Sequence, residues 1–201
     1  MAEITLKPEA SSLPLTVRPA WKQVLLVVGC SLFVAVCAHI SMPLFFTPVP
    51  LSLAPFAVLL IGLGMSPGAA AACLTLYLIE GAAGLPVFSP TGPGGFLQLT
   101  GLTGGYLLSY PAAAALASWM YRLYRQNFTS AALSAGVASL LILASGASWL
   151  EMHLHLDFGH IVNLAITPFL AGDALKVCAA AAAVTGWRRV RSGRHHAEES
   201  L

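Results

Sequence analysis

The sequence carries very little charge. Asp, Glu, Lys and Arg make up 9% of its 201 residues, whereas hydrophobic residues make up 57%. Soluble domains carry roughly 25% charged residues, so this composition excludes a water-soluble fold. The interior of the chain also lacks a Ser- or Pro-rich linker and any run of charged residues, because the polar stretches lie at the two ends. We therefore expect a single membrane domain.

Motifs for metal binding and catalysis are also absent from the sequence. The four cysteines form no C-x-x-C pair and have no zinc-site spacing, so we interpret them as small hydrophobic residues: Cys30, Cys37, Cys73 and Cys178. There is no G-x-x-x-x-G-K-[ST] phosphate loop, no G-x-S-x-G turn and no H-E-x-x-H site. This argues against ATP hydrolysis by this chain and against an intramembrane hydrolase. We expect no enzyme activity and no cofactor.

Six apolar segments approach the roughly 20 residues that a membrane-spanning helix needs. They cover residues 24–40, 51–65, 69–85, 97–121, 128–150 and 161–187, the last interrupted near Pro168 and Gly172. The Gly- and Pro-rich stretch 85–95 is predicted to be a loop or the lining of a cavity, because its backbone cannot face lipid. The predicted fold is an all-α bundle of six transmembrane helices within residues 22–187.

The basic residues predict the orientation of this bundle. Nine of the ten lie on one side of the six-span arrangement: Lys7, Arg18, Lys22, Arg122, Arg125, Arg188, Arg189, Arg191 and Arg194. Cytoplasmic flanks collect Lys and Arg, whereas short translocated loops do not. The polar segment 1–21 and the basic tail 188–201 are therefore both expected in the cytoplasm, on a multi-pass protein of the cell membrane. A net charge of +2, without a basic stripe, argues against a nucleic-acid partner.

The tenth basic residue, Lys176, lies inside the sixth apolar segment, three positions after Asp173. A charge at the centre of a membrane helix costs roughly 2.5 to 3.5 kcal/mol, so such residues are usually functional. Positions i and i+3 share one face of a helix. We predict that both side chains point into the bundle interior or a water-filled cavity and bind a solute with hydrogen-bond donors and acceptors. The alternative is a pair that only joins helices.

Four stretches of the sequence form a recognisable set, in order, between about residues 40 and 180. They are Thr47-Pro-Val-Pro50 with Phe56-Ala-Val-Leu-Leu60, Tyr77-Leu-x-x-Gly81-Ala-x-Gly84-Leu-Pro-Val-Phe88, Thr103-Gly-Gly-Tyr-Leu107 and Pro168-Phe-x-x-Gly172-Asp-x-x-Lys176. This set resembles the BioY family, the biotin-specific S components of energy-coupling-factor (ECF) transporters. The resemblance implies the S-component bundle, biotin as the ligand, and Asp173 and Lys176 as biotin contacts. It also implies that the loop at residues 45–50 covers the vitamin, and that a transmembrane coupling subunit and two ATPase subunits are partners.

Biotin combines a ureido ring, an apolar thioether ring and a flexible valerate tail, so its pocket should have aromatic walls and a few polar groups. The candidates near the expected outer end are Tyr77, Phe88, Phe96, Gln98 and Tyr106. For each aromatic residue, anchoring at the membrane interface or core packing is the alternative. Two positions depart from the family pattern. Ala54-Pro55 stands where relatives often have Gln-Thr, and Glu80 stands beside Gly81 where many relatives are apolar.

A pair of small residues, Ser31-x-x-x-Ala35, lies in the first apolar segment. Small residues at this spacing let helices approach closely. We predict that Ser31 and Ala35 contact the coupling subunit, and packing within the bundle itself remains the alternative.

The second candidate function depends on the segment Glu151-Met-His153-Leu-His155-Leu-Asp157-Phe-Gly-His160 in an expected outer loop. Imidazole and carboxylate groups at this density are ligands for zinc or nickel. The alternative function is therefore metal-ion uptake or sensing through this His-rich loop.

Overall fold

The computed structural model describes residues 20–155 and 157–198, which form eight helices and one two-stranded antiparallel ribbon. In chain order the elements are α1 (Ala20–His39), β1 (Ser41–Met42), β2 (Leu51–Ser52), α2 (Ala54–Gly64), α3 (Pro67–Ala82), α4 (Gly95–Thr100), α5 (Gly104–Leu123), α6 (Phe128–Leu154), α7 (Phe158–Ala165) and α8 (Thr167–Glu198). Nearly all of the predicted segment 1–21, with Lys7 and Arg18, lies outside the described residues. So do residues 199–201 of the predicted tail and the side chain of Arg194.

Six of these helices correspond to the six predicted apolar segments and form one bundle. Helix α5 packs against α2, α3 and α6, while α8 packs against α2 and α6, and α1 packs against α2 and α3. Small residues allow these close contacts. A Cβ atom added at Gly62 of α2 would lie 2.8 Å from the carbonyl oxygen of Ala114 in α5. Such approaches are typical of helices that associate in lipid, where apolar area alone gives no driving force.

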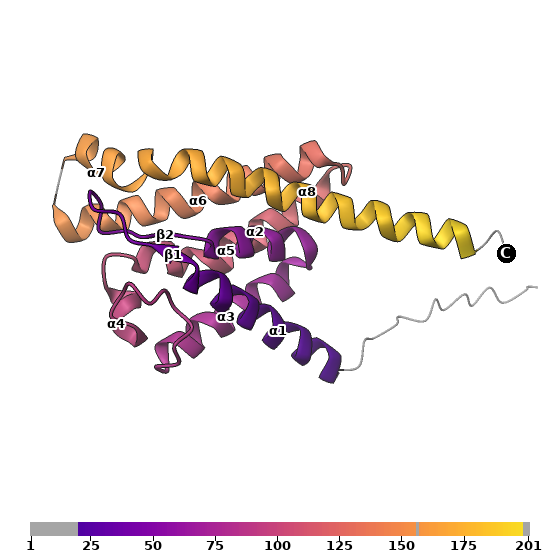
Figure 1. Cartoon of the computed structure of the whole chain (residues 1–201), viewed down its shortest axis with the longest axis horizontal. Coiled ribbons are helices and arrows are strands. Elements are labelled where there is room, and N and C mark those ends of the chain that lie inside the picture. The colour runs from indigo at the N-terminus through magenta and orange to yellow at the C-terminus, as the bar shows by residue number, and fades with distance from the viewer. Residues whose placement is uncertain (1–19, 156, 199–201) are drawn as a thin grey trace, which may run out of the picture.

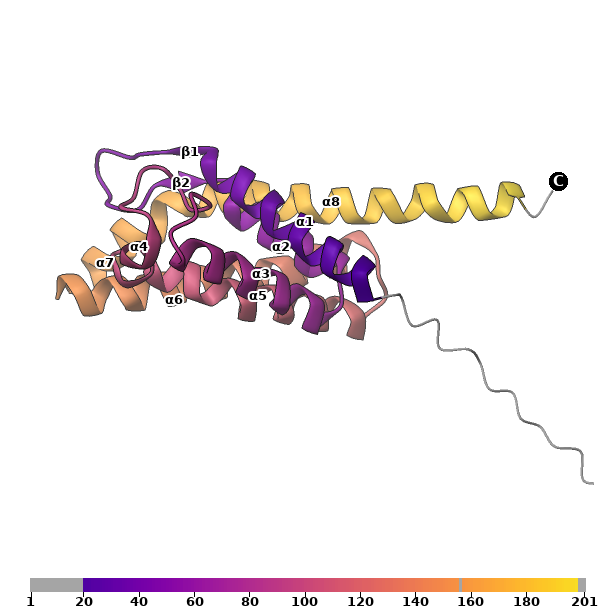
Figure 2. The same cartoon turned by 90° about the horizontal axis from the view of Figure 1, so that it is seen from below.

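The bundle has two unlike ends (Figure 1). Helix α1 begins and α8 ends at one of them, which we name the terminal end. The ribbon β1–β2, helix α4 and helix α7 gather at the other, which we name the loop end. Figure 2 shows the same separation after a quarter turn.

Three helices are long and apolar enough to cross a membrane, judged by length and composition over the described residues. They are Trp21–His39, Phe128–Leu154 and Thr167–Arg191, with mean hydropathies of 1.9, 1.7 and 1.4. Helices α2 and α3 are apolar but shorter, with 11 and 16 residues. Along α1, large apolar side chains such as Val24, Leu25 and Val36 are exposed. A continuous exposed apolar surface of this kind suits contact with lipid rather than water.

The predicted segment 97–121 is not one continuous helix, because α4 ends at Thr100 and α5 begins at Gly104. The turn between them depends on glycine. A Cβ atom at Gly104 would lie 2.0 Å from the carbonyl oxygen of Leu99. The carbonyl of Gly101 accepts two hydrogen bonds, one of 2.9 Å from the Gly104 N–H and one of 2.9 Å from the indole N–H of Trp149 in α6.

The helix break that was predicted near Pro168 and Gly172 lies earlier in the chain. The chain breaks at Ile166, between α7 and α8, and Gly172 lies inside α8. Pro168 falls in the first turn of α8, where its missing N–H costs no hydrogen bond because the first N–H groups of a helix lack intrahelical partners. The proline therefore follows the break and helps to start the next helix.

The all-α prediction missed the short ribbon. Ser41 pairs with Ser52 and Met42 pairs with Leu51 in an antiparallel register. The Leu53 N–H extends this link by donating to the Ile40 carbonyl over 3.0 Å. These bonds satisfy backbone groups that have no hydrogen-bond partner within α1 or α2. They also bring the two ends of the 43–50 loop together.

Candidate functional site

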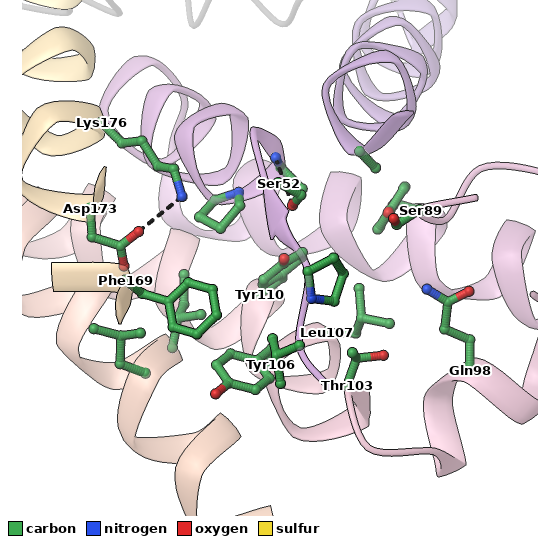
Figure 3. Close-up of a pocket in the computed structure, with 18 residues that line it drawn as sticks. Ser52, Ser89, Gln98, Thr103, Tyr106, Leu107, Tyr110, Phe169, Asp173 and Lys176 are labelled. Atoms are coloured by element: carbon green, nitrogen blue, oxygen red, sulfur yellow. Dashed lines mark hydrogen bonds and ion pairs between the residues drawn. The ribbon is translucent and has the colours of Figure 1, made fainter. Parts of the chain in front are cut away.

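A cavity of about 620 Å³, counting the open space at its mouth, lies toward the loop end of the bundle (Figure 3). Its wall comes from α1, α2, α3, α5, α6, α8 and the connections at the loop end. The lining residues are Ala38, Val49, Pro50, Ser52, Ala54, Pro55, Tyr77, Ser89, Gln98, Thr103, Tyr106, Leu107, Tyr110, Ile142, Leu143, Phe169, Asp173 and Lys176. Segments distant in the sequence therefore meet around one space.

Asp173 and Lys176 form one end of this cavity. The Lys176 ammonium donates to Asp173 Oδ1 over 2.9 Å, and both side chains are about nine-tenths buried. The Ser139 hydroxyl of α6 donates to the other carboxylate oxygen, Oδ2, also over 2.9 Å. The Asp173 and Lys176 side chains share one face of α8, in agreement with their i,i+3 spacing. The pair places a hydrogen-bond acceptor and a donor next to each other on the cavity wall.

Polar groups also lie at the opposite end of the cavity, where Figure 3 shows Gln98 and Ser89. Gln98 is 3% exposed, and its Oε1 accepts a 3.1 Å hydrogen bond from the Gly94 N–H. This bond orients the amide and leaves its NH₂ group as a donor. Ser89 donates to the Ser41 hydroxyl over 2.8 Å, which connects the loop before α4 to strand β1. The cavity therefore has polar groups at two separated ends.

Aromatic side chains form the wall between these ends, with Phe169, Tyr106 and Tyr110 in the centre of Figure 3. The Tyr106 and Phe169 rings lie with centroids 6.5 Å apart. The Tyr106 hydroxyl donates to the Ala165 carbonyl over 3.0 Å, at the C-terminal end of α7. Its ring occupies the space beside Gly146 of α6, where an added Cβ would lie 2.2 Å from ring carbons. Gly146 thus fixes where Tyr106 stands in the wall.

Tyr77 and Phe88 occupy different layers of the site. Tyr77 lines the cavity and is fully buried, and its hydroxyl has no hydrogen-bond partner among the described residues. Phe88 lies behind it, outside the lining, with the two ring centroids 5.3 Å apart in an edge-on arrangement. The structure therefore brings Tyr77 to the cavity and gives Phe88 a supporting position. Phe96 is 64% exposed and lies outside the lining as well.

Ser31 and Ala35, the predicted docking pair, are both buried within the chain. The Ser31 hydroxyl of α1 donates to the Glu80 carboxylate of α3. This geometry favours packing within the bundle, the alternative that the sequence left open, over a surface offered by these two side chains. This bond holds the Glu80 carboxylate at the α1–α3 interface. Glu80 does not line the cavity.

The His-rich segment does not form the metal site of the alternative prediction. The ring nitrogens of His153 lie 3.0 and 3.1 Å from the carbonyl oxygens of Trp149 and Thr100. His160 and Asp157 are exposed and 3.9 Å apart. In the part of the chain that the structure describes, no three His, Cys, Asp or Glu side chains come together to hold a metal ion. The metal hypothesis is therefore not supported.

Several lining residues were not predicted as ligand contacts. Thr103 and Phe169 lie within the family-like motifs, so the motifs could have identified them as candidates. Ser139, which lies outside the lining and holds Asp173, could not be found from a local motif, because the two residues are 34 positions apart in the sequence. Ala54 and Pro55, where the sequence departs from the family pattern, lie on the cavity wall and offer apolar side chains there.

Comparison with known proteins agrees with this geometry. The model of the BioY family matches residues 8–193. The chain is 30% identical to biotin transporter BioY2 of Lactococcus lactis over 152 residues, covering 76% of this chain and 81% of that protein. It is 32% identical over 159 residues to a probable biotin transporter BioY of Pyrococcus horikoshii, covering 79% and 91%.

One solved structure has the same fold. The crystal structure at 2.1 Å of the S-component for biotin from an ECF-type ABC transporter superimposes with a TM-score of 0.78 at 19% identity. The superposition covers 85% of this chain and 92% of that chain. Together with its three long apolar helices, this similarity identifies the chain as a membrane protein with an S-component fold. From the family model and the two relatives, the chain belongs to the BioY family.

Proposed function

We propose that this chain binds biotin in the cavity and serves as the substrate-binding subunit of an ECF-type uptake transporter. One observation supports this most strongly: the buried Asp173–Lys176 pair faces a cavity that has a second polar end and an aromatic wall between. Membership of the BioY family supports biotin as the ligand.

The groups that line the cavity match those of biotin. They combine a few polar side chains with apolar and aromatic walls, as is usual for small-molecule sites. The Asp173 carboxylate is an acceptor for a ureido N–H, and the adjacent Lys176 ammonium is a donor for the ureido carbonyl. Phe169, Tyr106 and Leu107 offer apolar surface to the thioether ring and the tail. The two side chains of the pair are about nine-tenths buried, so their hydrogen bonds are stronger than the same bonds in water.

The same reasoning assigns the valerate carboxylate to the end with Gln98 and Thr103. A second hollow, lined by Gln98, Thr103, Pro50 and the exposed loop around Gly92, adjoins this end. A carboxylate placed there keeps part of its hydration, whereas full burial of an unpaired charge is costly. In this orientation the neutral ring lies deepest and the charged tail lies nearest to water.

The Tyr77 hydroxyl is a further ligand contact. It is buried on the cavity wall, and no described residue accepts or donates a hydrogen bond to it. A buried polar group without a partner costs about 1 to 3 kcal/mol. A ligand that provides the partner recovers this energy on binding, so the hydroxyl favours biotin over a purely apolar solute.

The 43–50 loop covers the proposed binding site. Val49 and Pro50 line the cavity, while the Thr47 hydroxyl donates to the Leu164 carbonyl of α7 over 2.8 Å. The loop is thus held at its two ends by β1–β2 and in its middle by one hydrogen bond to α7. Thr47 and Val49 are also buried. The loop therefore opens when the Thr47 bond and this packing are both released, and we assign substrate access to this movement.

The proposed arrangement in the cell follows from the distribution of charge and from the positions of the chain ends. With the terminal end in the cytoplasm, Arg122, Arg125 and the arginines of α8 face the cytoplasm and the loop end with its cavity faces outward. The protein is then a multi-pass component of the cell membrane with six spans. The transmembrane coupling subunit and the two ATPase subunits supply the energy, and the exposed apolar face of α1 around Val28 and Leu32 offers the coupling subunit a surface.

Isothermal titration calorimetry of the purified full chain tests the proposal. We expect saturable binding of biotin without nucleotide or metal, weaker binding of biotin methyl ester because its tail has lost the charge, and no heat from nickel chloride. Nickel binding in the absence of biotin binding would refute the proposal and restore the metal hypothesis.

A further inference from the structure

A separate, larger hollow lies at the terminal end of the bundle, opposite the end that holds the proposed biotin cavity. This hollow, the terminal groove, is defined by Lys22, Gln23, Leu26, Ser66, Ala69 and Arg122 and has a volume of about 1,170 Å³, counting open space. It lies between the first turns of α1, the α2–α3 connection and the last turn of α5. Nothing in the proposed biotin site uses these residues.

The terminal groove is positively charged. Lys22 and Arg122 both line it, and its lining includes no acidic side chain from the residues that the structure describes. Within the described ranges, neither cation forms an ion pair with Asp or Glu. The Arg122 Nε donates to the Ser118 hydroxyl over 3.4 Å, which uses one of the five N–H donors of the guanidinium. The Lys22 ammonium lies 5.3 Å from the centroid of the Trp21 ring. Two cations from separate helices thus face one space.

Other groups at this level are hydrogen-bond donors. The Ser66 hydroxyl precedes α3 and makes no capping hydrogen bond, and the Gln23 side chain carries an amide NH₂. Below them, Leu26 and Ala69 give the groove an apolar wall, and Leu26 is 38% exposed. The occupant that this arrangement fits has an anionic head and a hydrocarbon chain.

We propose that the terminal groove binds the head group of an anionic phospholipid between Lys22 and Arg122, with an acyl chain lying along Leu26 and the small residues of α3. A free phosphate ion would satisfy the cations but would leave the apolar wall uncovered. Basic pockets between membrane helices on the cytoplasmic side commonly select anionic lipids. The first turn of α1 and the last turn of α5 place both cations at the membrane–water boundary, where such head groups lie.

Native mass spectrometry of the purified full chain tests this proposal with an equimolar mixture of phosphatidylglycerol and phosphatidylcholine. We expect at least a fivefold preference for phosphatidylglycerol in the wild type. The double variant Lys22→Ala/Arg122→Ala should lose this preference to within about twofold. Arg125→Ala removes a neighbouring exposed cation that does not line the groove, and it should keep the wild-type preference.

Two further arms make the result decisive. Inorganic phosphate added instead of lipid should not raise the melting temperature, whereas phosphatidylglycerol should raise it in the wild type and in Arg125→Ala. If Arg122→Ala unfolds because the Ser118 contact is lost, Lys22→Ala alone still tests the site and should reduce the preference at least twofold. An equal affinity for both lipids in the wild type, an unchanged preference in Lys22→Ala, or stabilisation by phosphate alone would overturn the proposal. None of these readouts depends on biotin.

Discussion

Asp173 and Glu80 are both carboxylates within apolar helices, yet their surroundings differ. Asp173 is bonded to the Lys176 ammonium and to the Ser139 hydroxyl, and it lines the cavity. Glu80 is bonded to the Ser31 hydroxyl across the α1–α3 interface, and it lines no described hollow. An acidic residue in an apolar helix therefore does not by itself indicate a ligand site. The adjoining cavity and the paired cation make the difference.

The two carboxylates therefore predict opposite results in a binding assay and in a stability assay. Asp173 should matter for biotin, because its pair faces the space that the ligand fills. Glu80 should matter for the packing of α1 against α3, because its bond joins those helices. Substitutions at these two carboxylates and in the cavity wall are expected to separate biotin binding from stability.

Removing either member of the Asp173–Lys176 pair should have the largest effect on biotin binding. We expect Asp173→Asn and Lys176→Ala to lower the affinity at least tenfold, about 1.4 kcal/mol. Calorimetric titration with biotin measures the loss. A substitution that leaves the remaining charge buried and unpaired should also lower the melting temperature, because breaking a buried pair destabilises a fold by about 3 to 5 kcal/mol. Wild-type affinity in both variants would show that the pair only joins helices.

Gly146→Ala should displace the Tyr106 ring from the cavity wall. The added Cβ would lie 2.2 Å from ring carbons of Tyr106, and overpacking of this kind costs about 1 to 3 kcal/mol. We expect a lower melting temperature and weaker biotin binding. Gly136→Ala in the same helix is the matched control, because no atom lies within 4 Å of the added methyl group. Equal behaviour of the two variants would mean that Tyr106 is not fixed by Gly146.

Tyr77 and Tyr106, two of the three tyrosines that line the cavity, should separate binding from stability. Tyr77→Phe removes a hydroxyl without a protein partner, so it should weaken biotin binding by about 1 kcal/mol and leave the melting temperature unchanged or raised. Tyr106→Phe removes the bond to the Ala165 carbonyl and should lower the melting temperature instead. Titration and thermal unfolding of both variants check this. If Tyr77→Phe binds biotin as the wild type does, its hydroxyl makes no ligand contact.

Glu80→Gln should have the smallest effect on binding. The amide keeps an acceptor for the Ser31 hydroxyl, so biotin affinity should stay within about twofold of the wild type, well inside 1 kcal/mol. Glu80→Leu removes the acceptor, leaves a buried serine hydroxyl without its partner and should lower the melting temperature. A tenfold loss of biotin affinity in Glu80→Gln would place Glu80 in the ligand site and contradict its assignment to helix packing.

Features that depend on local spacing were predictable from the sequence. The apolar segments were found because helix-forming runs are contiguous, and the Asp173–Lys176 pair was found because i,i+3 neighbours share a helix face. The four motifs indicate the family, which the comparisons confirm.

Features that depend on contacts between distant segments were not predictable in this way. The Ser139 bond to Asp173 and the burial of Ser31 against Glu80 each join two helices, and no local pattern encodes them. Long-range hydrogen bonds also lie at the two helix breaks. The Tyr106 hydroxyl donates to the Ala165 carbonyl beside Ile166, and the Trp149 indole donates to the Gly101 carbonyl at residues 101–103. Phe88 was named for its aromatic ring, yet only the fold shows that it lies behind Tyr77.

A crystal structure of the full chain with biotin would show whether the Asp173–Lys176 pair contacts the ligand. We predict that the ligand lies in the cavity, with its ureido ring within hydrogen-bond distance of Asp173 and Lys176 and its tail directed toward Gln98. Biotin bound elsewhere, with the Asp173–Lys176 pair still closed on itself and the cavity filled only by water, would contradict the account.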